Sequence, residues 1–229
     1  MTDKIKKITD KDIIHSITKG GLGAIPIIGS LASEIFELVV TPPLERRRAE
    51  WMNEVAEKLK KLEENHEIDF NNLKEDEQFI DVVLQATAFA LKTSEKKKIE
   101  SFRNTILNTA TGNSPDKTKS HIFLNLLDKF TTWHIVILDF IDSPIEWFKK
   151  KGKTPPSFTI GSLHSIIIVA FPELNGQDEL LDIIWRDLES TGFHKTGSLK
   201  SMMTGNGVLS DRTTDLGKEF INFITRDVA

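Results

Sequence analysis

The chain has 229 residues, of which 39% are hydrophobic and 28% charged, and its formal net charge is −4; this is the composition of a globular chain that can bury a core. The absence of cysteine excludes disulfides, thiolate metal sites and cysteine nucleophiles, and it fits a reducing compartment. The negative charge argues against general nucleic-acid affinity, and no export signal follows the basic start, so we expect a cytoplasmic protein.

The first half of the chain is predicted to be helical. Thr9 and Asp12 form a capping box for a helix over 10–19. A longer helix is predicted from the Pro42–Pro43 pair to about residue 64, because prolines favour a first helical turn. Its apolar residues recur at close to heptad spacing: Leu44, Trp51, Val55, Leu59 and Leu62.

Further helices are predicted over 76–92, from Ser94 to about 110, over 114–141 with a bend, and from Ser143 to about 151. Each combines a polar residue that can cap its start with apolar residues at helical spacing. Together these segments predict a helical bundle that occupies residues 1–152.

A polar, proline-containing break over 153–157 is the clearest domain boundary in the sequence. Beyond it we expect helices over 160–171 and 177–191, strands over 192–196 and 207–212, and a last helix from Thr214. This order is typical of a winged helix. The sequence therefore predicts an all-α fold with a small winged-helix-like α+β subdomain over 158–229.

No group of residues predicts a catalytic, cofactor or metal site. Glu63 and His66 have the spacing of one half of a di-iron motif, but the second copy that such sites need is missing. His134 with Asp139, and Ser162 with His164, are acid–base or hydrolytic pairs only if they meet in space, which spacing does not show. We expect these histidines to be partly buried and bonded to backbone carbonyls.

Residues 20–40 are apolar and nearly long enough to span a bilayer. Glu34 and Glu37 would be costly at membrane depth, however, and they fall on one helical face with Ser30, Ser33 and Thr41. The opposite face carries Ile28, Leu31, Ala32, Ile35 and Val39. This pattern predicts an amphipathic helix rather than a transmembrane one.

Two interpretations of this helix remain open: a core helix of the bundle, or a membrane-surface element flanked by basic residues. Lysines precede the segment, and Arg46, Arg47 and Arg48 follow it. The residues predicted to bind a membrane or a partner are Ile28, Leu31, Ile35, Val39, Arg46, Arg47 and Arg48.

The 177–191 helix occupies the position of a DNA-recognition helix, but its charge is wrong for that role. It carries five acidic residues against Arg186 alone, whereas recognition helices work beside phosphates. We therefore expect no duplex DNA binding, and we interpret 158–229 as a module for protein interaction or self-association.

The sequences GGLGAIPIIGS and TPPLERRRAEW resemble the glycine-rich N-terminal region of bacterial abortive-infection proteins of the Abi-alpha type. ELLDIIWRDLESTGF and TTDLGKEFINFI are similar to the ending of those proteins. The resemblance covers the two ends of the chain and implies an anti-phage defence role in which the N-terminal part acts at the membrane. The expected function is a non-enzymatic helical interaction protein, peripheral at the inner membrane face; the alternative is an enzyme or enzyme accessory whose site the sequence does not reveal.

Overall fold

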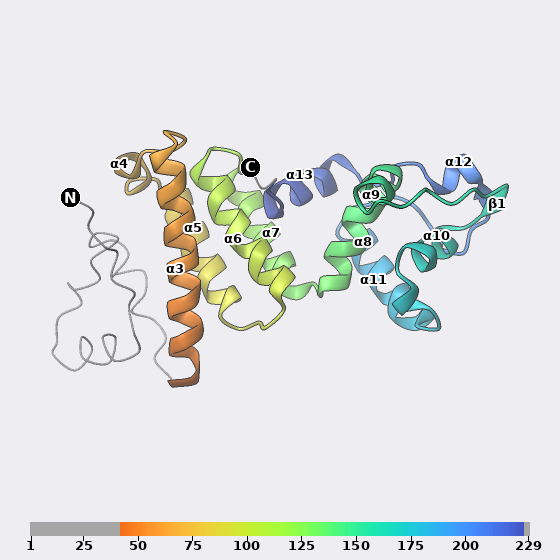
Figure 1. Cartoon of the computed structure of the whole chain (residues 1–229), viewed down its shortest axis with the longest axis horizontal. Coiled ribbons are helices and arrows are strands. Elements are labelled where there is room, and N and C mark those ends of the chain that lie inside the picture. Colours follow the sequence, from red (N-terminus) through yellow and green to blue (C-terminus); the bar gives the residue numbers. More distant parts are fainter. Residues whose placement is uncertain (1–41, 227–229) are drawn as a thin grey trace. The chain divides into compact units, whose positions relative to one another are not determined.

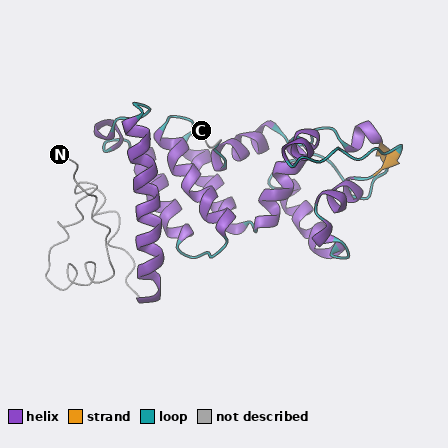
Figure 2. Cartoon of the chain, in the orientation of Figure 1, coloured by secondary structure: helices purple, strands orange, loops and turns teal. Residues whose placement is uncertain are grey.

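The computed structural model describes residues 42–226, and most of these are helical (Figures 1 and 2). This confirms the predicted all-α fold with a small α+β end. The only sheet among the described residues has two antiparallel strands. The chain divides into two compact units, one ending at Leu124 and the other beginning at Asn125.

The first unit is built from helices α3 to α6 and the start of α7. These are α3 (Pro42–Glu64), α4 (Phe70–Leu73), α5 (Glu77–Ala90), α6 (Lys96–Ala110) and α7 (Lys117–Lys129). Carboxylates cap three of the helix starts, including Asp69 at the start of α4, as expected for this position. Asp76 accepts a hydrogen bond from the Phe79 backbone N–H, and Asp116 accepts one from that of Lys119.

The core of the first unit forms where α6 packs against both α3 and α5. The predicted apolar stripe of α3 is buried from Trp51 to Leu62, and Phe102 and Ile106 of α6 are fully buried. The Trp51 indole N–H donates to the Thr87 hydroxyl at 3.1 Å, which ties α3 to α5. Burial of these side chains accounts for most of the stabilisation of such a unit.

The second unit contains the end of α7 and all later elements. These are α8 (Thr132–Asp142), α9 (Pro144–Lys150), β1 (Ile160–Gly161), α10 (Leu163–Ala170), the 3-10 helix η2 (Pro172–Leu174), α11 (Asp178–Ser190), β2 (Met203–Thr204), α12 (Gly205–Val208) and α13 (Asp215–Ile224). Helix α8 packs against α11 and α13. Phe130 meets Phe193 and Phe220 edge-on with ring centres 6.0 Å apart in both pairs, which is a favoured aromatic geometry.

The predicted positions of the strands are wrong. Residues 207–208 lie in α12, and the 192–196 segment contributes one isolated bridge between His194 and Thr213. The sheet instead pairs Ile160 with Thr204 and Gly161 with Met203. The segment over 153–157, predicted as a boundary, connects α9 to β1 inside the second unit.

Within the described part of the chain, none of the helices is both long enough and apolar enough to cross a bilayer.

Candidate functional site

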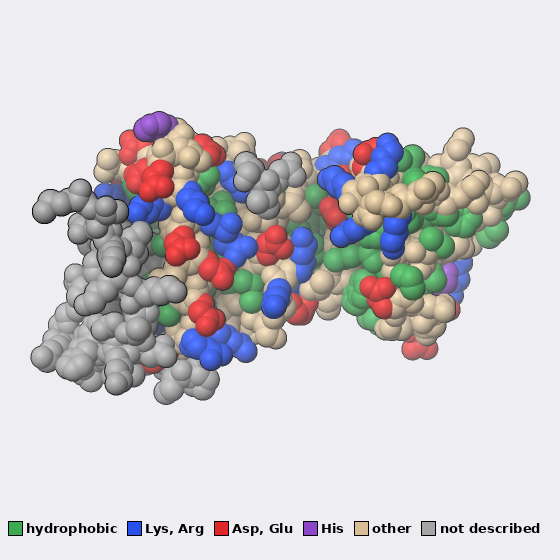
Figure 3. Space-filling view, viewed as in Figure 1, with side chains coloured by type: hydrophobic (Ala, Val, Ile, Leu, Met, Phe, Trp, Pro, Cys, Tyr) green, Lys and Arg blue, Asp and Glu red, His purple; other side chains and the backbone are tan. Residues whose placement is uncertain are grey.

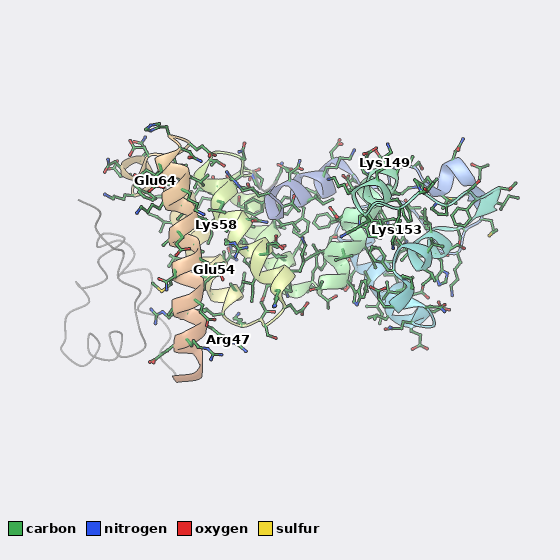
Figure 4. All side chains as sticks on the ribbon, viewed as in Figure 1. Arg47, Glu54, Lys58, Glu64, Lys149 and Lys153 are labelled. Atoms are coloured by element: carbon green, nitrogen blue, oxygen red, sulfur yellow. The ribbon has the colours of Figure 1, made fainter. Side chains whose placement is uncertain are left out.

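The second turn of helix α3 is basic, and we define this basic turn as Arg46 and Arg47. Both side chains are exposed, and that of Arg46 retains 77% of its accessible surface. Figure 4 labels Arg47 at the start of α3, and Figure 3 shows a blue cluster of Lys or Arg side chains at the same place. Five residues separate this turn from the end of the apolar 20–40 segment in the sequence, so basic groups lie close to the apolar residues along the chain.

The ion pair between Arg46 and Glu50 does not prevent the basic turn from binding another anion. Arg46 Nε lies 3.6 Å from Glu50 Oε1, but both side chains are largely exposed. An exposed ion pair of this kind contributes little free energy and is screened by salt. Either arginine can therefore exchange its contacts for another anion.

Arg48 differs from its two neighbours because it is half-buried. Burial lowers the pKa of its guanidinium, while the charge of Glu45 raises it. The sequence grouped the three arginines together, but the helical turn directs Arg48 toward the protein. The other predicted interaction residues, Ile28, Leu31, Ile35 and Val39, lie outside the described residues.

Further along α3 the charges alternate in sign. Glu54, Lys58 and Glu64 follow one another up the helix (Figure 4). Glu54 forms an ion pair with Arg103 of α6, and Lys60 lies 3.7 Å from Glu64. The excess of positive charge on α3 is therefore local to its first turns.

His134 is part of a helix cap, although the sequence left a catalytic role open. Its Nδ1 accepts a hydrogen bond from the Thr131 backbone N–H at 3.2 Å, and its ring stacks on Phe130 with centres 4.7 Å apart. Its Nε2 faces Asp187 of α11 at 3.5 Å. This carboxylate comes from a helix that is distant in the sequence.

His194 is buried and both of its ring nitrogens are bonded. Nδ1 accepts from the Thr196 backbone N–H at 3.2 Å, so Nε2 carries the proton and donates to the Trp185 carbonyl at 3.0 Å. Burial lowers the pKa of this imidazole, and the two backbone hydrogen bonds oppose that shift. Both ring nitrogens of His194 therefore bond to the backbone. The sequence predicted such an environment for His134 and His164 instead, and His164 bonds the Asp178 carboxylate.

His164 makes a short contact with the carboxylate of Asp178. Its Nε2 lies 2.7 Å from Asp178 Oδ1, and Lys200 lies 3.5 Å from the other oxygen. The hydrogen bond from His164, and then the charge of Lys200, lower the pKa of Asp178. Ser162, the proposed hydrolytic partner, is buried and caps α10 by accepting from the Ser165 backbone N–H at 3.2 Å.

Glu63 and His66 do not form half of a di-iron site. They line an open hollow at the end of α3 together with Glu67, Ile68 and Asp69. His66 adopts a left-handed backbone conformation with φ of 61°, and the backbone N–H groups of His66 and Glu67 bond to Glu63 and Leu62. This is the hydrogen-bond pattern of a Schellman motif, in which glycine is the usual residue at the His66 position.

No group of three or more His, Cys, Asp or Glu side chains in the described ranges could hold a metal ion. The sequence analysis missed Asp187 and Asp178 as histidine neighbours. They lie 53 and 14 residues from their histidines, and no local pattern marks such a contact.

Comparison with known proteins adds no family: no family model, no curated protein and no solved structure matches the chain.

Proposed function

We propose that this chain is a non-enzymatic interaction protein whose N-terminal end associates with an anionic membrane surface, in the anti-phage defence role that its resemblance to Abi-alpha proteins implies. The observation that supports this proposal is the basic turn of α3, in which Arg46 and Arg47 are exposed a few residues after the apolar 20–40 segment. Apolar residues beside exposed basic ones are the usual components of a membrane-surface element.

The magnitude of the electrostatic contribution is modest but measurable. A basic residue close to an anionic bilayer contributes about 1 kcal/mol at moderate ionic strength, so the basic turn contributes about 2 kcal/mol. Arg48 is left out of this sum because its half-buried side chain already has protein contacts. The remaining affinity must come from the apolar face of the preceding segment, led by Ile28, Leu31, Ile35 and Val39.

The test is co-sedimentation of the full chain with phosphatidylglycerol vesicles at low salt. Replacing Arg46→Gln and Arg47→Gln together should weaken binding by about thirtyfold, the equivalent of about 2 kcal/mol. The matched control replaces Lys58→Gln and Lys61→Gln, two exposed lysines on later turns of the same helix. The control should change binding by less than about threefold, and neither variant should alter the melting temperature, because surface substitutions have small effects.

Failure of the native chain to sediment with anionic vesicles would exclude membrane association. Equal weakening by both double variants would show that binding depends on overall charge and not on the basic turn.

An enzymatic function is the second candidate, and the specific observation that favours it is the pair formed by His164 and Asp178. A histidine oriented by a carboxylate is the base arrangement of many hydrolases. Replacing His164→Gln tests this alternative in cells that express the full chain. An enzyme should lose its effect on phage growth, whereas an interaction protein should retain it.

A further inference from the structure

The two-stranded ribbon of the second unit, β1 with β2, has an outer and an inner face. Ile160 pairs with Thr204 and Gly161 pairs with Met203. Side chains alternate between the faces of a strand, so Ile160 and Thr204 share one face. Met202 lies just before β2 and is exposed as well. Diagonal neighbours in an antiparallel ribbon are close enough for long side chains to interact.

The outer face exposes its apolar side chains. Ile160 retains 63% and Met202 retains 69% of their accessible surface, the largest fractions among the exposed large hydrophobic residues of the described chain. Figure 3 shows green hydrophobic side chains on the surface of this unit near the place of β1 in Figure 1. These two aliphatic side chains form a small apolar surface on the ribbon that a partner could cover.

The inner face holds the ribbon in place. The Phe158 ring lies over Gly161, where an added Cβ would come within 3.2 Å of it. Arg212 donates to the Gly207 carbonyl and lies 3.3 Å from the Met203 sulfur. The exposed side chains therefore project from an anchored support rather than from a loop without contacts.

The segments that lead into and out of the two strands are basic, although the whole chain is acidic. Residues 151–161 and 195–210 carry Lys151, Lys153, Lys195 and Lys200 and contain no Asp or Glu. Lys153, which Figure 4 labels after α9, and Lys195 are both exposed. Lys200 lies 3.5 Å from Asp178, and Lys151 lies 5.9 Å from the centre of the Trp147 ring. This charge is complementary to an anionic partner.

We propose that the outer face of the ribbon is a second membrane-contact site, at which Ile160 and Met202 enter the interface of an anionic bilayer and lysines of the segments that lead into the two strands meet lipid phosphates. Aliphatic side chains beside lysines fit the acyl chains and headgroups of a lipid surface. This inference rests on the proposed membrane association and adds a contact in the second unit.

Nucleic acid fits the ribbon less well than lipid. Single-stranded nucleic acid is bound by stacking on exposed aromatic rings, but the exposed side chains here are Ile160 and Met202, and Phe158 packs on Gly161.

The absence of cysteine allows a direct test in the full chain. Met202→Cys is labelled with an environment-sensitive nitrobenzoxadiazole dye, and its emission is followed as phosphatidylglycerol vesicles are added. The matched control labels Ile183→Cys, an apolar position on α11 that is 48% exposed. We expect a blue shift at position 202, none at 183, and none at either position with phosphatidylcholine vesicles.

A second measurement uses affinity. Replacing Ile160→Ser and Met202→Ser together should weaken vesicle binding about tenfold, because apolar contact with the bilayer is lost, whereas Ile183→Ser should leave it unchanged. The melting temperature should be retained, since the replaced side chains are exposed.

The outcomes separate this inference from the proposed function. If the chain sediments with vesicles but the dye at 202 does not shift, the ribbon site is excluded and the basic turn of α3 is left as the contact. A dye shift produced by RNA or DNA but not by vesicles would also overturn the lipid assignment. If the native chain does not sediment at all, both proposals fall together.

Discussion

Asp142 is the last residue of α8, where the helix dipole disfavours a negative charge. Its Oδ1 is buried without a well-formed hydrogen bond, as is the Nε of Arg212. Burial raises the pKa of the Asp142 carboxyl; the charge of Lys218 lowers it and that of Asp211 raises it again. The Thr213 hydroxyl offers the carboxylate only a poorly formed hydrogen bond, which also lowers the pKa of Asp142. Lone polar groups of this kind destabilise a fold unless a partner is supplied.

The raised pKa of Asp142 gives the first prediction, a pH dependence of stability. The folded protein binds this proton more tightly than the unfolded chain does. Protonation of Asp142 therefore stabilises the fold, and this stabilisation is fully present below the unfolded pKa of about 4. It is lost as the pH rises through the folded pKa. Asp142→Asn should therefore be more stable than the native chain at neutral pH, by less than about 1 kcal/mol because solvent screens the site.

Chemical unfolding at several pH values measures this effect. The difference in the free energy of unfolding between Asp142→Asn and the native chain should shrink as the solution is made acidic. Asp182→Asn, at an exposed position of α11, is the control and should show no such trend. A native chain that loses stability faster than Asp142→Asn on acidification would contradict the assignment.

His66 gives the second residue-scale prediction, because its left-handed backbone conformation is costly for a residue that carries a Cβ. His66→Gly should raise the free energy of unfolding by about 0.5–1 kcal/mol. His66→Ala removes the same imidazole but keeps the Cβ, so it should not stabilise the protein. Equal stabilisation by Gly and Ala in thermal or urea unfolding would indicate that the side chain, and not the backbone, causes the strain.

Among the elements, the ribbon depends most on one glycine. A Cβ on Gly205 would overlap the backbone carbonyl of Phe158, and the Gly205 N–H donates to the Thr159 carbonyl at 3.3 Å. The chain therefore passes too close to β1 at this point for any side chain. This close approach, rather than an unusual φ, is why a glycine is required there.

Gly205→Ala should consequently destabilise the protein by about 1–3 kcal/mol, the usual cost of overpacking. Gly197→Ala is the matched control, since a Cβ at that position meets nothing within 4 Å. Thermal unfolding of the two variants distinguishes them. If the ribbon site exists, Gly205→Ala should also reduce the dye shift at position 202 on vesicles, because the ribbon would be displaced.

The helices were largely predictable from the sequence because their signals are local. A capping residue and apolar residues at 3.6-residue spacing mark α5 and α13, whose starts at Asp76 and Thr214 are capped in the structure. The ribbon was not predictable, since each strand has two residues and their pairing joins segments more than 40 residues apart. The sequence did not distinguish Arg48 from Arg46 and Arg47, because its partial burial depends on tertiary packing.

At the scale of the whole molecule, the distribution of charge decides which anionic partner is possible. The chain is acidic overall, yet it is basic at the first turns of α3 and along the ribbon segments. Helix α11 concentrates five acidic residues: Asp178, Glu179, Asp182, Asp187 and Glu189. Local basic regions of this kind can meet a surface at separate points, whereas a duplex needs a continuous positive face.

The last prediction is that the full chain does not bind duplex DNA. A mobility assay at low salt is the most sensitive condition, because electrostatic affinity falls steeply as salt is added. We expect no shifted band for a random-sequence duplex at protein concentrations that saturate phosphatidylglycerol vesicles.

A variant of α11 tests whether its charge is the cause. Asp182→Asn and Glu189→Gln together remove two exposed negative charges from this helix. If repulsion by α11 is what prevents binding, this variant should show weak, salt-sensitive retardation that the native chain lacks. Tight binding by the native chain would mean that Lys153, Lys195 and Lys200 outweigh the acidic helix, and it would favour nucleic acid over lipid as the partner of the ribbon.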